Sequence, residues 1–159
     1  VGYQPPLGDN VLKLPAGVSV AKLGQADEAW PTVAPRQLGY QFRGYELDSK
    51  RRPVFRYEVS SAKVTENYDP IGTPDQPGFR RTVRVEPASD AGALYVRLAA
   101  AARIVEGPGG GYVLDDQSRL KISAGSARPV IRKQGNQMEL LVPVPAGGQK
   151  FEVAVEWLW

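Results

Sequence analysis

The sequence predicts an all-β chain that folds as a single antiparallel β-sandwich with a Pro-rich extended N-terminal segment. Segments in which apolar and polar residues alternate recur at intervals of roughly 8–15 residues, which is typical of sandwiches and barrels. The 17 glycines and 14 prolines among 159 residues exceed average usage and favour many turns. No helical pattern is long enough to compete with these strand signals. A chain of this length is expected to form one domain with a buried core.

Residues 1–37 are expected to form an extended cover segment, and residues 38–159 the sandwich domain. Prolines are frequent in the first of these segments, where they break helices and remove hydrogen-bond donors from strand ladders. We expect one short strand at Val18–Leu23 and a single helical turn at Ala26–Ala29. The segment would therefore lie over one edge or end of the sandwich.

The clearest hairpin pairs residues 38–47 with residues 53–60. Both segments alternate between apolar and polar residues, and Asp48–Arg52 has the composition of a turn. The parity of the alternation changes at Gly44, which predicts a β-bulge there.

The rest of the chain is expected to continue as strands joined by turns. A weaker strand at Ala62–Tyr68 precedes a predicted Pro- and Gly-rich loop over residues 69–78. In the next strand Phe79, Arg81, Val83 and Val85 share one face, opposite Arg80, Thr82 and Arg84. The expected strands after this loop are Phe79–Val85, Leu94–Leu98 with an extension through Ala99–Ala102 to Arg103–Glu106, Tyr112–Leu114, Arg119–Ser123, Pro129–Lys133, Gln137–Val144 and Lys150–Trp159.

Composition excludes several kinds of chemistry. The chain has no Cys and no His, so it has no disulfide, thiolate nucleophile, Cys/His zinc site or Ser-His-Asp triad. The net charge is +3 and the longest basic run is Lys50-Arg51-Arg52, which argues against nucleic-acid binding. No apolar stretch reaches the roughly 18 residues of a membrane span. We expect no catalytic residue, no metal and no cofactor in this chain.

Three residues are candidates for binding. Trp30 lies between loop-like segments and is expected to plug one end of the sandwich, with an exposed contact as the alternative. Arg80 and Arg84 lie on the outward face of one strand. They would meet an acidic partner or anionic sugar, or else pair with Glu or Asp on the next strand, which is the preferred interpretation. Most other aromatic residues have strand spacing and are expected in the core.

Two local motifs have structural explanations that we prefer to functional ones. Gly107–Gly111 lacks the Lys and Ser/Thr that follow a phosphate-binding loop, so it is expected to be a hairpin loop. Asp115 and Asp116 are too few for a calcium loop and are expected to form a turn.

One segment resembles a known bacterial module. Residues 38–59, LGYQFRGYELDSKRRPVFRYEV, are similar to its GYxFxGYxLDxxxRPxFxY segment, and weaker similarity covers most of residues 11–159. This poorly characterised β-rich module occurs in large exported proteins beside a c-type cytochrome segment carrying CxxCH, often with a sugar-dehydrogenase-like propeller. The resemblance implies a non-catalytic module of a periplasmic or secreted assembly, with the c-type cytochrome or other segments of that assembly as partners.

The resemblance does not make this chain a haem protein. Without CxxCH or His it offers no covalent haem site and no His ligand, and Met138 is expected in the core. Another segment or chain would carry the haem. The first residue, Val1, also fits an exported protein whose signal has been removed.

Three functions follow from these observations. The first is a structural or interaction module of an exported haem-protein or sugar-oxidising, electron-transfer assembly. The second is a carbohydrate-binding module, because the sandwich carries 3 Trp, 7 Tyr and 4 Phe. The third is a small carboxylate-based hydrolase or lyase, which would need two acids converging in a cleft.

Overall fold

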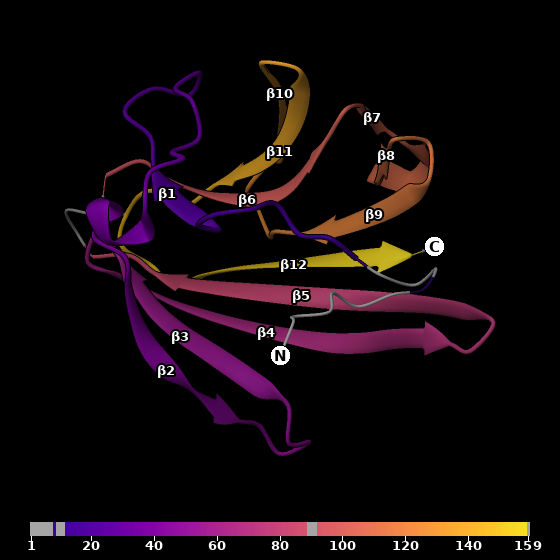
Figure 1. Ribbon diagram of the computed structural model, residues 1–159, viewed down its shortest axis with the longest axis horizontal. Helices are drawn as coiled ribbons and strands as arrows, with labels where there is room; N and C mark the ends of the chain where they lie inside the picture. The colour runs from indigo at the N-terminus through magenta and orange to yellow at the C-terminus, as the bar shows by residue number, and fades with distance from the viewer. Residues whose placement is uncertain (1–7, 9–11, 89–91, 159) are drawn as a thin grey trace, which may run out of the picture.

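Two antiparallel β-sheets pack against each other in the computed structural model, which describes residues 8, 12–88 and 92–158 (Figure 1). The predicted β-sandwich is confirmed. The larger sheet has eight strands in the order β2 (Gln41–Leu47), β3 (Pro53–Val59), β4 (Ala62–Thr73), β5 (Gln76–Glu86), β12 (Phe151–Leu158), β9 (Ser118–Ser123), β8 (Tyr112–Leu114) and β7 (Ile104–Glu106). The smaller sheet has four strands in the order β1 (Val20–Lys22), β6 (Leu94–Ala101), β11 (Gln137–Pro143) and β10 (Val130–Gln134).

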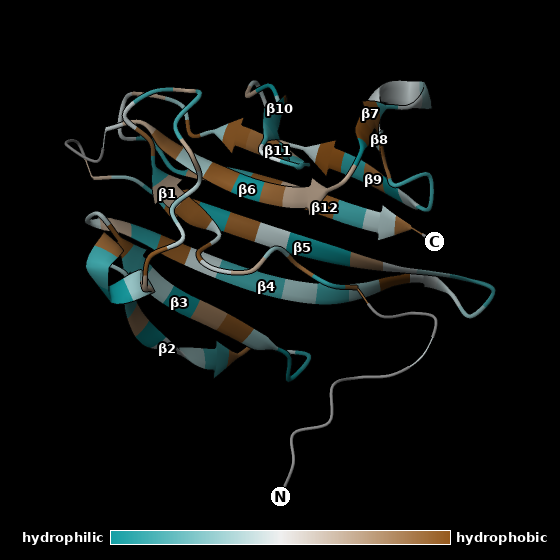
Figure 2. Cartoon of the chain, turned by 45° about the horizontal axis from the view of Figure 1, so that its top comes forward, coloured by the Kyte–Doolittle hydropathy of each residue, from teal (hydrophilic) through white to brown (hydrophobic). Residues whose placement is uncertain are grey.

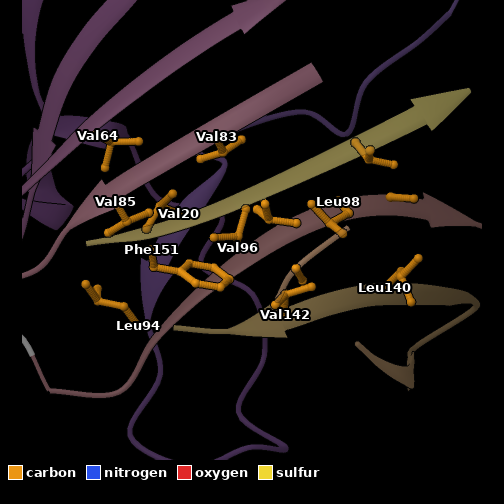
Figure 3. Close-up of a cluster of buried hydrophobic side chains, with 14 of the residues drawn as sticks. Val20, Val64, Val83, Val85, Leu94, Val96, Leu98, Leu140, Val142 and Phe151 are labelled. Atoms are coloured by element: carbon orange, nitrogen blue, oxygen red, sulfur yellow. The ribbon is translucent and has the colours of Figure 1, made fainter. Parts of the chain in front are cut away.

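The main core lies between the two sheets, where apolar side chains from both meet (Figure 3). Strict alternation in β12 buries Phe151, Val153, Val155 and Trp157 and leaves the intervening residues less buried. Figure 2 shows this alternation as hydrophobic and hydrophilic bands along the strands. Because burial of each large apolar side chain contributes about 1.5–3 kcal/mol, the alternating pattern dictates which face of each strand turns inward.

The first hairpin forms as predicted. The pairing of β2 with β3 shifts register between Phe42 and Gly44, so the expected bulge is present. Gly44 has a φ of 100°, which side-chain-bearing residues rarely adopt. In the turn, the Asp48 carboxylate accepts hydrogen bonds from the backbone N–H groups of Lys50 and Arg52, at 2.8 and 2.9 Å.

The loop predicted for residues 69–78 is wrong. β4 continues to Thr73 and β5 begins at Gln76, so these residues extend one long hairpin. Beyond Asn67 β4 has no paired neighbour on the β3 side, and Pro77 lies beyond the last residue pair of β5 with β12. Prolines are tolerated where a strand has a neighbour on one side only, so Pro70 and Pro77 do not end these strands.

Two further expectations need correction. The segment Arg103–Glu106 does not continue the preceding strand, because the chain crosses after β6 and β7 joins the larger sheet. Residues 25–28 form one hydrogen-bonded turn and no helix, with the Glu28 N–H donating to the Gln25 carbonyl at 3.1 Å. A short 3-10 helix, η1 (Pro35–Leu38), appears instead, and a proline at its start has the φ that a helix needs.

The predicted cover segment supplies an edge strand of the smaller sheet and the side chains that cover that sheet's outer face. β1 pairs with β6 along the edge of the smaller sheet. Trp30, from the following loop, packs with Val18, Ala21, Leu23 and Leu141 in a second, smaller apolar cluster. Two prolines of the cover segment, Pro5 and Pro6, lie outside the described residues.

No helix in the described ranges has the length and hydrophobicity that crossing a membrane requires.

Candidate functional site

Part of the inner face of the larger sheet is left uncovered by the smaller sheet. Figures 1 and 2 both show β2 and β3 lying away from β1, β6, β11 and β10. Phe42 and Tyr45 on β2 are 57% and 64% exposed. The aromatic residues on and beside this part of the sheet, here called the aromatic face, are Tyr40, Phe42, Tyr45, Phe55, Tyr57 and Tyr68.

The bulge in β2 gathers these rings on one side. Phe42 pairs with Tyr57, and Tyr45 pairs with Phe55, although Phe42 and Tyr45 are three residues apart. In a regular strand an odd spacing places two side chains on opposite faces. Because the bulge adds one residue, both rings lie on the same face, and the parity change at Gly44 was the sequence signal for this arrangement.

Aromatic rings form a continuous row across five strands. Their centroids are separated by 6.2 Å between Tyr45 and Phe55, and by 6.1 Å between Phe55 and Tyr68. The row continues to Phe79 at 5.7 Å and from there to the buried Trp157 at 6.4 Å. These separations lie in the range of favourable aromatic pairs, so the exposed end of the row is anchored in the core.

The aromatic face borders a hollow of about 320 Å³. Another hollow, of about 420 Å³, lies beside the turn between β4 and β5, and no aromatic side chain is among its described lining residues. The wall of the aromatic hollow facing the sheet comes from the segment before β1 and from Pro35. A second, more open hollow of about 720 Å³ shares Pro35, Tyr40 and Phe42 with it. The two together are here called the aromatic groove, and its lining residues are Gly17, Val18, Ser19, Ala34, Pro35, Arg36, Gly39, Tyr40, Gln41, Phe42, Phe55, Tyr57, Glu66 and Tyr68.

A buried ion pair supports the floor of the groove. Arg81 on β5 donates from Nη2 to Glu66 Oε1 on β4 at 3.0 Å and from Nε to Glu66 Oε2 at 3.2 Å. The Tyr68 hydroxyl donates to Glu66 Oε2 at 2.6 Å, and the Tyr57 hydroxyl donates to Glu66 Oε1. Arg81 also donates from Nη1 to the Arg97 carbonyl of β6 at 3.3 Å, which links the two sheets.

The network fixes the charge states of its members. Burial would raise the pKa of Glu66, but the charge of Arg81 and the hydrogen bonds from Arg81 and the tyrosines outweigh it and lower that pKa. Burial, and then the Glu66 charge, raise the pKa values of Tyr57 and Tyr68. At neutral pH the floor therefore holds one carboxylate, one guanidinium and two neutral hydroxyls.

Neither Glu66 nor Arg81 was singled out from the sequence. The alternation of β5 does place Arg81 on the face shared by Phe79, Val83 and Val85, which was the available signal. A charged residue on a core face needs a partner, but identifying Glu66 requires the β4–β5 register.

Trp30 packs in the apolar cluster on the outer face of the smaller sheet. The ring is 4% exposed, and its Nε1 donates to the Val18 carbonyl at 3.0 Å. The Arg97 guanidinium lies over the ring at 4.9 Å from its centroid. Trp30 is therefore buried, as expected for a plug, but it covers the outer face of the smaller sheet and not one end of the sandwich. Its burial leaves almost no ring surface for a ligand.

Arg80 and Arg84 lie on the outer face of the larger sheet, away from the aromatic groove. Arg80 donates from Nε to Glu156 at 2.9 Å, and Arg84 Nε lies 2.7 Å from a Glu152 carboxylate oxygen. Both carboxylates belong to the neighbouring strand β12, which is the pairing preferred from the sequence.

The two local motifs take structural roles. In Gly107–Gly111, the Gly107 N–H donates to the Gly111 carbonyl at 2.7 Å and closes the loop between β7 and β8. Asp115 and Asp116 have φ values of 50° and 57° in the turn between β8 and β9. In the described part of the chain no group of three or more acidic residues is placed to hold a metal ion.

No family model, curated protein or solved structure matches the chain. The aromatic groove and the resemblance of residues 38–59 are therefore the two features of the chain that indicate a function.

Proposed function

We propose that this chain is a non-catalytic recognition module of an exported bacterial haem-protein or sugar-oxidising assembly, and that the aromatic groove is its binding surface. The observation that carries the proposal is the exposure of Phe42 and Tyr45 beside a hollow whose floor is held by a buried ion pair. Gathered exposed aromatic side chains next to a concave surface are typical of binding sites.

The chemistry of the lining favours binding over catalysis. Glu66 is the carboxylate among the lining residues, and it is already engaged by Arg81, Tyr57 and Tyr68. Glycoside hydrolysis by two carboxylates would need a second acid at the groove. The raised pKa values of Tyr57 and Tyr68 also make these hydroxyls poor general bases at neutral pH.

The proposed context comes from the resemblance of residues 38–59 to a module found beside c-type cytochrome segments. The residues that carry it include Tyr40, Phe42, Tyr45, Phe55 and Tyr57, which all belong to the aromatic face. The same motif therefore builds the hairpin and supplies most of the rings. This coincidence supports a recognition role within a periplasmic or secreted assembly.

The test is a purification of the native assembly through an affinity tag on this chain, from the source bacterium. We expect the chain to retain a protein with the absorbance of c-type haem and with sugar-dependent dye reduction. The double variant Phe42→Ser/Tyr45→Ser is expected to raise the KM of that reaction and leave kcat unchanged, because recognition is lost and chemistry is not.

The matched control is Val130→Ser, which changes an exposed apolar residue on β10 in the other sheet. Purified wild-type chain without haem protein or sugar oxidation would overturn the assembly context. Loss of kcat at unchanged KM in the groove variant would overturn the non-catalytic assignment, and unchanged kinetics would overturn the binding surface.

A further inference from the structure

We infer that the ligand of the aromatic groove is a neutral saccharide, whose rings stack on Phe42 and Tyr45 and whose hydroxyls bond to the groove wall. The inference rests on the proposed function and specifies what the recognition module recognises. Four properties of the groove lead to it: its size, its charge, the mixture of rings and hydroxyls that line it, and the bulged edge of β2.

The size of the groove suits a small ligand or a short stretch of a chain. The hollow between Pro35 and the aromatic face has about 320 Å³, at the lower end of the roughly 300–1,000 Å³ of ligand pockets. It continues past Tyr40 and Phe42 into the more open hollow beside η1. A ligand made of repeated small units can enter the first and extend into the second.

The charge of the groove favours a neutral ligand. In the hollow that contains Tyr57 and Tyr68, the titratable acid is Glu66, and Arg81 compensates it at 3.0 Å. An anionic or cationic ligand would lose hydration there without gaining an opposite charge. Arg36 lines the second, open hollow, so an acidic saccharide is the alternative that the experiment must separate.

The lining combines flat apolar surfaces with hydroxyl groups. A sugar ring has the same duality, because its C–H face is apolar and its hydroxyls donate and accept hydrogen bonds. Phe42 and Phe55 provide ring faces in the lining, and Tyr40 and Ser19 provide hydroxyls. Tyr45 lies outside the lining but beside it, with its ring centroid 6.2 Å from that of Phe55. A purely apolar ligand would leave these hydroxyls without partners.

The edge of β2 argues against an added strand as the occupant. Among the described strands β2 is the outermost of the larger sheet, and an outer edge of this kind can template a peptide or a second copy. The register shift between Phe42 and Gly44 breaks the ladder in the middle of this seven-residue strand. Bulges of this kind hinder strand addition, so the exposed rings are left for a ligand that needs no backbone pairing.

The supporting network holds the rings behind the exposed side chains before the ligand arrives. Tyr57 and Tyr68 are tied to Glu66, and the Tyr40 ring lies 4.8 Å from the Tyr57 ring. Phe55 is held between Tyr45 and Tyr68. Since ordering side chains on binding costs free energy, a groove that is already rigid binds more tightly.

The experiment is isothermal titration of the 159-residue chain with soluble six-unit oligosaccharides. The neutral probes are cellohexaose, xylohexaose and mannohexaose, and hexagalacturonate is the acidic one. We expect at least one neutral probe to bind. Phe42→Ala and Tyr45→Ala should each weaken it by about tenfold, which is the loss expected from one stacked ring. Tyr45→Phe, which keeps the ring, should stay within about twofold of wild type.

Val130→Ala is the control and should bind as wild type, and a thermal melt of each variant checks folding. Failure of every neutral probe would overturn the inference, as would stronger binding of hexagalacturonate that is lost in Arg36→Ala. Association of the chain into a dimer that Phe42→Ala dissociates would also overturn it. If no neutral probe binds while Phe42→Ser/Tyr45→Ser still raises the KM of the native assembly, the recognition module stands and only its ligand is misassigned.

Discussion

Glu66 and Arg81 form an ion pair across β4 and β5, with side chains that are only 4% and 1% exposed. The two residues are diagonal neighbours, because Glu66 pairs with Val83 and Arg81 pairs with Tyr68. Both lie on the inner face at the point where the apolar core ends and the aromatic groove begins. Because the two charges neutralise each other, both side chains can stay buried at the border of the groove, where apolar side chains would otherwise pack.

Glu66→Gln should lower the free energy of unfolding by about 3–5 kcal/mol, because the buried Arg81 loses its counter-charge. The double variant Glu66→Gln/Arg81→Met should be more stable than this single variant. The amide oxygen of Gln can accept from one of the Tyr57 and Tyr68 hydroxyls and its NH2 can donate to the other, and no unpaired charge remains. Urea denaturation measures both values, and a neutral effect of Glu66→Gln would contradict the role assigned to the pair.

Stability should fall at both ends of the pH range. Glu66 has a pKa below its ordinary 4.5, so its contribution is present above that value and is lost as pH falls through the lowered pKa. Tyr57 and Tyr68 have pKa values above their ordinary 10.0, so their contribution is lost as pH rises beyond 10.0. Urea denaturation from pH 3 to about 11 tests this. Tyr68→Phe should flatten the alkaline decline, and an unchanged slope would count against the network.

Trp30→Ala should destabilise the chain by about 3–5 kcal/mol, because a large buried side chain is removed from the second apolar cluster. Trp30→Phe should cost less but leave the Val18 carbonyl without its donor. Thermal or urea unfolding measures the difference. Val33→Ala, at an exposed position nearby, is the control and should change stability by less than about 0.5 kcal/mol.

Arg80→Ala and Arg84→Ala should each change the free energy of unfolding by less than about 1 kcal/mol, since both ion pairs lie on the outer face of the sheet, where solvent and salt screen them. Neither change should affect saccharide binding, because both residues lie on the opposite face from the groove. Titration and urea denaturation of the same variants provide the test, and a lost saccharide signal in Arg84→Ala would place the ligand on the outer face instead.

Alternation and turn composition were sufficient to predict most of the sandwich. They located the first hairpin, its bulge, and the buried face of β12, because each depends on residues close together in sequence. They failed at residues 69–78, where Pro and Gly normally indicate a loop. Whether a strand can contain Pro70 depends on whether it has neighbours on both sides, and that is a property of the whole sheet.

The candidate site was harder to predict, because it depends on how far one sheet extends past the other. Phe42 and Tyr57 both have the spacing of core residues, but Tyr57 is 6% exposed and Phe42 57%. In a larger second sheet Phe42 would be covered as well. The Glu66–Arg81 pair likewise needs the register of two long strands. The burial of Trp30, in contrast, could be predicted from its local setting, whereas its place on the outer face of the smaller sheet depends on β1 and Leu141.

The pairing of β1 with β6 has a consequence for how the chain can be shortened. A protein that starts at residue 38 would lack β1 and Trp30, so the edge of β6 and the outer side of Leu141 would face water. We expect such a fragment to aggregate at concentrations where the whole chain stays monomeric, which light scattering would reveal; a monodisperse fragment would contradict this. The cover segment thus shields the edge and the outer face of the smaller sheet from solvent. A protein shortened for expression should therefore begin before Val18 and not at the start of the first hairpin.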